Sequence, residues 1–309
     1  MRIMFMGTPD FAAVSLEALI DEGYEVVCVI SQPKKPKNRG MKLLETPVGS
    51  VAEQNGIRLC QPETLRDNAI LPLLEEVKPD LIVVVAYGKL LPEYVLNYPK
   101  YGCINIHGSL LPKYRGAAPI QYSIIKGEEE TGVTSMYMAK GMDTGDMIIK
   151  SAIPIEDDDT AETLHDKLAV LGAEVLLETV SEIEHGRAPR VPQNDAEATY
   201  ASMLTKEMGK IDWEKSAREI FNLVRGLDPW PSAYSYIDGK RFKVFGVSVE
   251  DKGGAPGEIL EVGETLLVGT GEGALRIREV GFDNKKRMKV SDFLRGNKDT
   301  FQKGKILDK

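Results

Sequence analysis

The strongest candidates for chemistry in this chain are an asparagine, a histidine and an aspartate. Asn105 and His107 end a short apolar run that leads into a loop rich in glycine and proline. In an extended strand, residues two positions apart point to the same face, so the amide and the imidazole should project side by side. Asp143 lies in a second loop, between two glycines. Together, an amide, an imidazole and a carboxylate can polarise a carbonyl group and move a proton.

Each of these residues also has a structural interpretation, and other catalytic patterns are missing. Asp143 could be a turn residue that hydrogen-bonds to its own backbone. His165 and His185 fall in a predicted helix and at its end, and we interpret both as structural. The chain has no G-x-S-x-G motif, so no nucleophilic serine is indicated. It also has no G-x-G-x-x-G motif after its first strand, so a dinucleotide site would lack its usual phosphate-binding turn.

The elements that must position these residues follow a β-α-β order, which is typical of a parallel sheet with helical crossovers. The predicted strands of this part lie at 3–6, 25–31, 79–86, 103–107, 131–138 and 146–153. In open parallel sheets, ligands bind beyond the carboxyl ends of the strands. The loops expected to share one cleft are 7–10, 86–90 and 107–112.

The last third of the chain changes character. Residues 189–205 are polar and rich in proline, as in a linker, and five short strand-like runs follow between residues 233 and 280. Five strands in about a hundred residues predict a small barrel of the oligonucleotide-binding type. The predicted organisation is therefore a catalytic domain at 1–188, a linker at 189–205 and a C-terminal domain at 206–309.

Charge is unevenly distributed along the chain, whose net charge is −8. Residues 1–205 contain 19 Lys and Arg against 30 Asp and Glu, a balance of −11, whereas residues 206–309 contain 20 against 17, a balance of +3. Two basic clusters stand out, at 32–42 and at 285–289, and the prolines of the first predict a loop. Each cluster could be an ordinary solvated surface, but such clusters can bind phosphates, and we favour that function for both.

The composition is that of an ordinary globular protein, with 42% hydrophobic and 28% charged residues. The longest apolar run, 81–86, is too short to span a membrane, and no signal peptide is visible. The three cysteines are scattered, which argues against disulfides and against a zinc site. We therefore expect a cytoplasmic protein with no membrane partner, and a monomer.

Four motifs together resemble the 10-formyltetrahydrofolate-dependent formyltransferases. They are Asn105-Ile-His107, Gly108-Ser-Leu-Leu-Pro112, Tyr114-Arg-Gly-Ala-Ala-Pro119 and Met142-Asp-Thr-Gly-Asp146. Three further stretches are similar to the members that act on methionine carried by the initiator tRNA. These are Met6-Gly-Thr-Pro-Asp-Phe11, Asn38-Arg-Gly40 and Leu227-Asp-Pro-Trp-Pro-Ser-Ala233.

The resemblance implies an α/β fold: a Rossmann-like formyltransferase domain with a mostly parallel sheet, followed by a small open OB-like β-barrel that holds tRNA. It implies transfer of the formyl group of 10-formyltetrahydrofolate, a co-substrate, to the methionine α-amino group of initiator methionyl-tRNA, with no metal. Asn105 and protonated His107 would stabilise the formyl oxygen. Asp143 would favour the imidazolium and order a water for proton transfer.

The resemblance and the basic clusters also give two sets of binding residues. The residues expected to line the folate cleft are Ala86, Tyr87, Gly88, Leu90, Ser109, Leu110, Leu111 and Pro112. The residues expected to contact tRNA are Lys34, Lys35, Lys37, Arg39, Lys42, Lys285, Lys286, Arg287 and Lys289.

Three alternatives share parts of this pattern. Formyl transfer to a sugar-nucleotide amine, and hydrolysis or oxidation of formyltetrahydrofolate, would use the same Asn, His and Asp. We expect the sugar-modifying and oxidising proteins to carry a large extra domain. A tRNA-binding module without catalysis is the third alternative, and the presence of all three residues argues against it.

Overall fold

The computed structural model describes residues 1–37, 42–282 and 286–308. The chain forms two compact units that interleave in sequence. The N-terminal unit contains residues 1–116, 131–153 and 165–200, and the C-terminal unit contains residues 117–130, 154–164 and the chain from 201 onward. Two segments from earlier in the chain, 117–130 and 154–164, therefore pack with the last third, and the domain limits at 188 and 206 stay a prediction.

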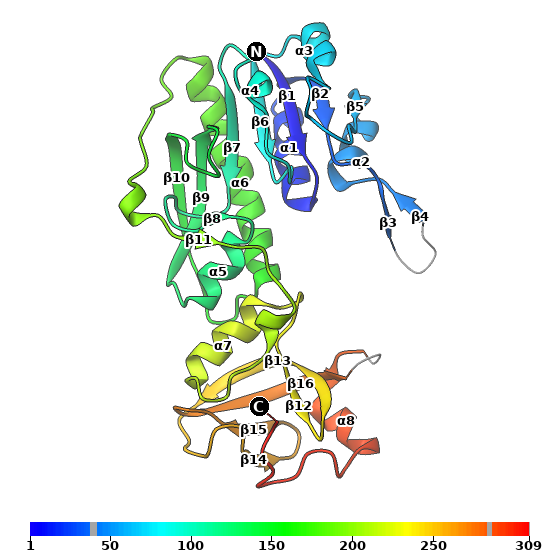
Figure 1. Ribbon diagram of the computed structural model, residues 1–309, viewed down its shortest axis with the longest axis vertical. Coiled ribbons are helices and arrows are strands. Elements are labelled where there is room, and N and C mark those ends of the chain that lie inside the picture. Colours follow the sequence, from blue (N-terminus) through cyan, green and yellow to red (C-terminus); the bar gives the residue numbers. More distant parts are fainter. Residues whose placement is uncertain (38–41, 283–285, 309) are drawn as a thin grey trace. The chain divides into compact units, whose positions relative to one another are not determined.

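The N-terminal unit is built on a seven-stranded sheet in the order β10-β9-β7-β6-β1-β2-β5 (Figure 1). The five strands from β7 to β5 are parallel and β9 is antiparallel to β7, so the predicted mostly parallel sheet is confirmed. The strands are β1 (Arg2–Gly7), β2 (Glu25–Ile30), β5 (Leu59–Cys60), β6 (Leu81–Val85), β7 (Cys103–His107), β9 (Glu130–Tyr137) and β10 (Met147–Pro154).

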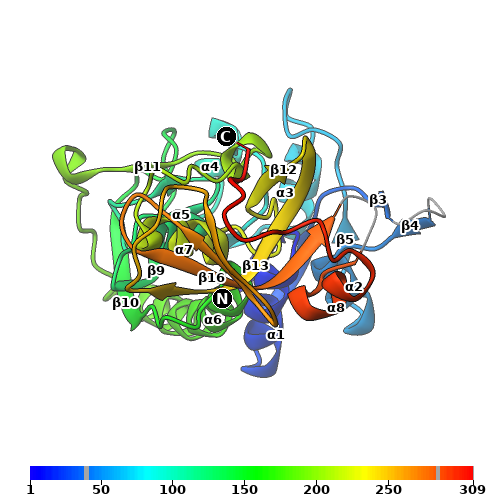
Figure 2. The same ribbon diagram turned by 90° about the horizontal axis from the view of Figure 1, so that it is seen from below.

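Helices cover both faces of this sheet. Helices α1 (Asp10–Asp21) and α6 (Ala161–Glu184) lie on one face, and α3 (Leu71–Val77) and α4 (Glu93–Leu96) lie on the other (Figure 2). A Cβ at Gly172 of α6 would stand 3.3 Å from Ile106, so the even-numbered residues of β7 face α6. Cys103 packs in the core on the opposite side. Because side chains alternate along a strand, Asn105 and His107 share that opposite face.

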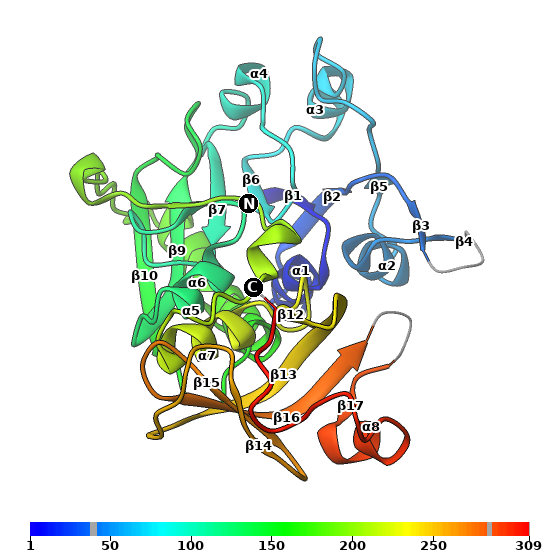
Figure 3. The same cartoon turned by 60° about the horizontal axis from the view of Figure 1, so that its bottom comes forward.

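The predicted basic loop is in part a hairpin, which corrects the sequence interpretation. Strands β3 (Lys35–Lys37) and β4 (Lys42–Leu44) pair in antiparallel fashion and extend away from the sheet beside α2 (Pro47–Gln54) (Figure 3). Pro36 is compatible with this ladder because a two-stranded ribbon has free edges, where a missing N–H costs little. Pro36 therefore lies in an edge strand rather than in an unpaired loop, whereas Pro33 precedes β3.

The C-terminal unit is an antiparallel sheet that curves into a half-barrel, as the sequence predicted. Its strand order is β12-β13-β16-β15-β14, and β17 pairs with β16. The strands are β12 (Tyr234–Ile237), β13 (Lys240–Glu250), β14 (Ile259–Val262), β15 (Leu266–Gly269), β16 (Ala274–Phe282) and β17 (Met288–Lys289). Its helices are α5 (Pro119–Ile125), α7 (Ala217–Gly226) and α8 (Val290–Gly296), where α7 packs on β13 and α5 packs on α7.

The remaining elements are short. They are β8 (Arg115–Gly116), β11 (Tyr200–Ala201) and the 3₁₀ turns η1 (Asp195–Glu197) and η2 (Glu207–Gly209). Within the described residues, no helix combines the length and the apolar character that crossing a membrane requires.

The half-barrel depends on an aromatic core. Phe242 is fully buried, and its ring lies 5.3 Å from that of Phe301 and 5.6 Å from that of Phe282. We expect Phe242→Ala to lower the free energy of unfolding of this unit by about 3–5 kcal/mol, because transfer and cavity costs add. The measurement is urea unfolding followed by tryptophan fluorescence. Val249→Ala, on the same strand but 39% exposed, is the control and should cost less than about 1 kcal/mol.

Candidate active site

Asn105 and His107 lie at the carboxyl end of β7, between two neighbouring strands. The register pairs Asn105 with Val84 of β6, so the loop that begins at Ala86 comes alongside His107. On the other side, His107 pairs with Thr134 of β9. The sheet therefore brings the two polar side chains and the loop after β6 to one edge, as the order of strands predicted.

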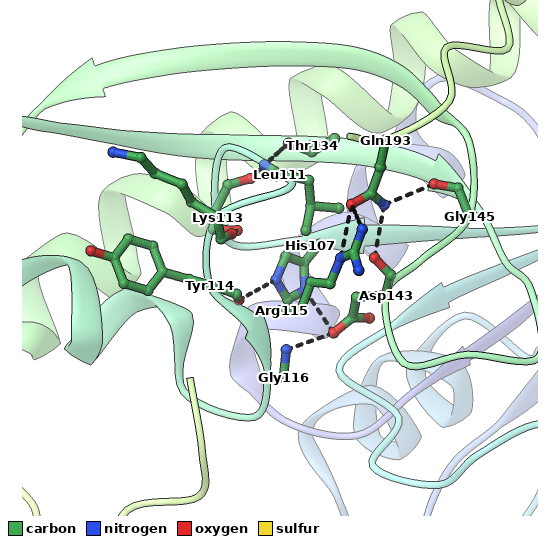
Figure 4. A network of polar contacts seen from close by, with 11 residues as sticks. His107, Leu111, Lys113, Tyr114, Arg115, Gly116, Thr134, Asp143, Gly145 and Gln193 are labelled. Atoms are coloured by element: carbon green, nitrogen blue, oxygen red, sulfur yellow. Dashed lines mark hydrogen bonds and ion pairs between the residues drawn. The ribbon is translucent and has the colours of Figure 1, made fainter. Parts of the chain in front are cut away.

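His107 is nearly buried, at 6% exposure, and both of its ring nitrogens face oxygen atoms (Figure 4). Its Nε2 lies 3.0 Å from the carbonyl oxygen of Tyr114, and its Nδ1 lies 3.7 Å from Oδ2 of Asp143. A carbonyl oxygen only accepts hydrogen bonds, so Nε2 must carry a hydrogen. Nδ1, which faces the carboxylate, is therefore the nitrogen whose protonation can change.

Asp143 reaches His107 from the loop between β9 and β10, residues 138–146. Its Oδ2 accepts a hydrogen bond of 2.8 Å from the backbone N–H of Gly116. Its φ is +53°, in the left-handed region, which is uncommon for residues other than glycine although aspartate tolerates it better than most. Nearby, a Cβ at Gly145 would stand 1.7 Å from the carbonyl oxygen of Tyr137, so only glycine fits. The loop is tightly constrained at its backbone.

The Asn105 side chain is half-buried and free to bind a substrate. None of the described residues hydrogen-bonds to its amide. A half-buried amide without a protein partner retains two N–H donors for a ligand oxygen. The described residues contain no cluster of three His, Cys, Asp or Glu side chains that could hold a metal. The chemistry that Asn105, His107 and Asp143 supply is hydrogen bonding and proton transfer.

The loop after β7 is fixed by buried hydrogen bonds. The Thr134 hydroxyl donates to the Ser109 carbonyl oxygen at 2.7 Å and accepts from the Leu111 N–H at 3.1 Å. Lys150 Nζ donates to the Leu111 carbonyl oxygen at 2.9 Å. The side chains of Ser109 and Leu111 are buried, whereas those of Leu110 and Pro112 are half-buried. Ser109 and Leu111 can thus meet a ligand through their backbone only.

The loop after β6 alternates between core and surface. Tyr87 is buried, and burial raises the pKa of its hydroxyl to about 12. Its carbonyl oxygen accepts a 3.0 Å hydrogen bond from Gln32 Nε2. Ala86, Gly88 and Leu90 are exposed. The side chains of these three, rather than that of Tyr87, are available to a ligand.

Three lysines of the first basic cluster belong to the β3–β4 hairpin. They are Lys35, Lys37 and Lys42, whereas Arg39 lies outside the described residues. Lys34, at the base of the hairpin, forms an ion pair of 2.6 Å with Glu45. Its charge is therefore shared with a carboxylate of the same unit.

The second basic cluster divides into an engaged arginine and exposed lysines. Arg287 pairs with Asp228 at 2.9 Å and with Glu279, and its guanidinium lies 4.4 Å from the ring centroid of Phe245. Arg287 thus has structural partners that the sequence interpretation missed. Lys286 and Lys289 are exposed, and Lys285 lies outside the described residues.

Sequence reasoning also missed two residues beside the site, Arg115 and Gln193. Arg115 is 2% exposed, and its guanidinium donates to Gln193 Oε1 at 3.0 and 2.9 Å. Gln193 comes from the segment that was interpreted as a linker, 78 residues away along the chain. The one signal in the sequence was that Arg115 lies in the motif Tyr114-Arg-Gly-Ala-Ala-Pro119, directly before Gly116, whose N–H donates to Asp143.

Comparison with known proteins gives a family match over most of the chain. The family model described as formyl transferase matches residues 1–180, and its C-terminal domain model matches residues 203–298. The chain is 52% identical over 300 residues to a methionyl-tRNA formyltransferase of Caldanaerobacter subterraneus, with 96% of this chain and 97% of that protein covered. It is 50% identical to one of Alkaliphilus oremlandii, with 99% of each covered.

Solved structures share the fold at lower identity. An N-formyltransferase of Helicobacter canadensis, in complex with folinic acid and dTDP-3-aminofucose, matches with a TM-score of 0.70 and 21% identity over 93% of this chain and 99% of that chain. HypX of Aquifex aeolicus, in complex with tetrahydrofolic acid, matches with a TM-score of 0.64 and 20% identity. The whole of this chain is covered there, but it spans only 51% of HypX.

Thr134 offers a direct test of how the loop after β7 is held. We expect Thr134→Val to lower the free energy of unfolding by about 1–3 kcal/mol, because the Ser109 carbonyl and the Leu111 N–H lose a buried partner. Thermal and urea unfolding measure this change. Thr131→Val is the matched control on β9: Thr131 is 3% exposed and no described residue bonds to its hydroxyl. Equal losses in the two variants would contradict this account of the loop.

Proposed function

The chain belongs to the formyl transferase family, and on that premise we infer that it transfers the formyl group of 10-formyltetrahydrofolate to the α-amino group of methionine on initiator methionyl-tRNA. The observation that carries this conclusion is the 52% identity, over 96% of the chain, to a methionyl-tRNA formyltransferase. The product, formylmethionyl-tRNA, serves translation initiation.

One argument against the sugar-nucleotide alternative is wrong. We expected sugar-modifying proteins to carry a large extra domain, yet 93% of this chain covers 99% of the Helicobacter N-formyltransferase. Length therefore does not separate the two activities. Sequence identity does, because it is 21% to that protein and 52% to the Caldanaerobacter one.

The free amide of Asn105 fits the first step. The methionine amine attacks the formyl carbon, and negative charge develops on the formyl oxygen. A donor that is already positioned, and that has no protein partner to give up, stabilises such a charge effectively. Asn105 has these properties, since it lies half-buried on the rigid end of β7 without a described partner.

His107 and Asp143 suit the two roles predicted for them. A protonated His107 would stabilise the formyl oxygen, and Asp143 would order a water that takes the proton of the attacking amine. The Nε2 of His107 is engaged by the Tyr114 carbonyl oxygen, so the second N–H of the imidazolium would be at Nδ1. Asp143 Oδ2, 3.7 Å away, places a negative charge where the imidazolium would form. The imidazolium in turn adds positive charge beside the formyl oxygen, which supports the predicted role of His107.

The folate co-substrate would lie along the loops after β6 and β7. The exposed Ala86, Gly88 and Leu90 and the half-buried Leu110 and Pro112 are accessible to it by their side chains. Ser109 and Leu111 would contribute backbone groups, and the buried side chain of Tyr87 would support the loop after β6 from the core. This refinement keeps all eight residues in the wall but divides them into contacting and supporting members.

The tRNA would meet the β3–β4 hairpin and the half-barrel. Lys37 of β3 pairs in register with Lys42 of β4, and the ribbon that they belong to extends from the sheet (Figure 3), which suits contact with phosphates. Of the second cluster, the exposed Lys286 and Lys289 are better candidates than Arg287, whose partners hold it in the C-terminal unit. A monomeric state and a cytoplasmic location stay predictions.

The catalytic assignment is tested by alanine variants of Asn105, His107 and Asp143. We expect kcat to fall about 100-fold or more in each, because each removes either a donor to the developing charge or a member of the proton pathway. The assay follows formylmethionyl-tRNA formed from 10-formyltetrahydrofolate and charged initiator tRNA. Product formation at the wild-type rate in His107→Ala or Asp143→Ala would overturn the assignment.

Arg39 tests the role of the hairpin. We expect Arg39→Ala to lower kcat/KM for methionyl-tRNA by about tenfold through the loss of one charge-assisted contact, with kcat nearly unchanged. The slope of log kcat/KM against log salt concentration should also become shallower by about one. The KM for 10-formyltetrahydrofolate is the internal control and should not change. Wild-type kcat/KM in this variant would refute a tRNA contact at Arg39.

A further inference from the structure

Gln193 lies in a stretch of chain that is otherwise turned to solvent. Between residues 191 and 197, it is the one residue that is not exposed. Figure 4 shows its side chain directed at the loop that carries Asp143 and at the guanidinium of Arg115. A polar side chain that turns inward from an exposed segment indicates a specific contact.

The amide of Gln193 uses all of its hydrogen-bonding capacity. Its Oε1 accepts from Nε and Nη2 of Arg115, at 3.0 and 2.9 Å. Its Nε2 donates to the carbonyl oxygens of Asp143 and Gly145, both at 2.8 Å. Arginine can only donate and a carbonyl can only accept, so the chemistry permits just one orientation of this amide.

Arg115 makes the position of Gln193 rigid. Its guanidinium is buried, and Nη2 also pairs with Oδ1 of Asp195 at 2.7 Å. Asp195 follows Gln193 by two residues, so one segment supplies both the counter-charge and the amide. A buried charge that is paired and hydrogen-bonded is costly to displace, which fixes the amide against the loop.

The same segment is joined to the Asp143 loop at a second point. The backbone N–H of Val191 donates to the carbonyl oxygen of Met147 at 3.0 Å, and the N–H of Met147 donates to the carbonyl oxygen of Val191 at 2.9 Å. Arg190 lies 3.7 Å from the ring centroid of Tyr137. Residues 190–195, which we call the strap, therefore hold the loop at both of its ends.

We propose that Gln193 is a positioning residue, which holds the backbone at Asp143 and Gly145 so that the Asp143 carboxylate faces Nδ1 of His107. This inference rests on the proposed function, because Asp143 and His107 are its assigned catalytic pair. The left-handed φ of Asp143 is uncommon for a non-glycine residue, so contacts to its backbone help to keep it in that conformation. The bonds from Gln193 to the carbonyls on either side of Thr144 supply that support.

The experiment compares Gln193→Glu with Asn194→Ala. Glutamate keeps both acceptor contacts to Arg115 but has no N–H to offer the two carbonyls. Asn194, next in the strap, hydrogen-bonds only within the η1 turn, so its variant controls for general loosening. The two readouts are kcat and the NMR signals of the His107 ring, which the His107→Ala variant identifies among three histidines.

We expect Gln193→Glu to lower kcat about 10- to 100-fold, with KM for both substrates within about threefold of wild type, and to shift the His107 ring signals. Asn194→Ala should leave both readouts unchanged. A wild-type kcat in Gln193→Glu, or a lowered kcat with unchanged His107 signals, would overturn the positioning role. An inactive wild-type protein would instead refute the proposed function.

Discussion

The site depends on holding one carboxylate against one imidazole, although the two groups come from separate parts of the chain. His107 stands on the end of β7, which is paired on both sides and cannot move. Asp143 stands on a loop, in a backbone conformation that an aspartate does not prefer. The position of the loop that carries Asp143 is therefore the part of the site that needs the most support. Most of the surrounding contacts restrain this loop.

Those restraints are mainly made by backbone and side chain together rather than by hydrophobic packing. Gly116 donates to the carboxylate, Gln193 holds the carbonyls, and Gly145 allows a close approach to Tyr137. Hydrogen bonds of this kind are directional, so they fix the orientation of the groups that they join. Apolar contacts are not directional and fix that orientation less closely. By contrast, Asn105 needs no polar restraint, because the strand itself determines where it points.

Sequence reasoning succeeded where a periodic or local rule applied. Alternation along a strand placed Asn105 and His107 on one face, and the order of elements gave the parallel sheet and the half-barrel. It failed where two residues far apart in sequence meet through polar groups, as Arg115 and Gln193 do. No periodicity marks such a pair. The same limit applies to Lys34 and Arg287, whose carboxylate partners became visible only in the fold.

The interleaving of the two units has a consequence for how such a protein can evolve or be divided. Helix α5 lies within the first matched family segment, yet it packs on α7 in the second, where a Cβ at Gly226 would stand 2.7 Å from Ile125. Cutting the chain near residue 188 would remove α7 from α5 and expose the apolar surface of α5 to water. Gene fusion or recombination at that point would therefore transfer neither half as a self-sufficient module.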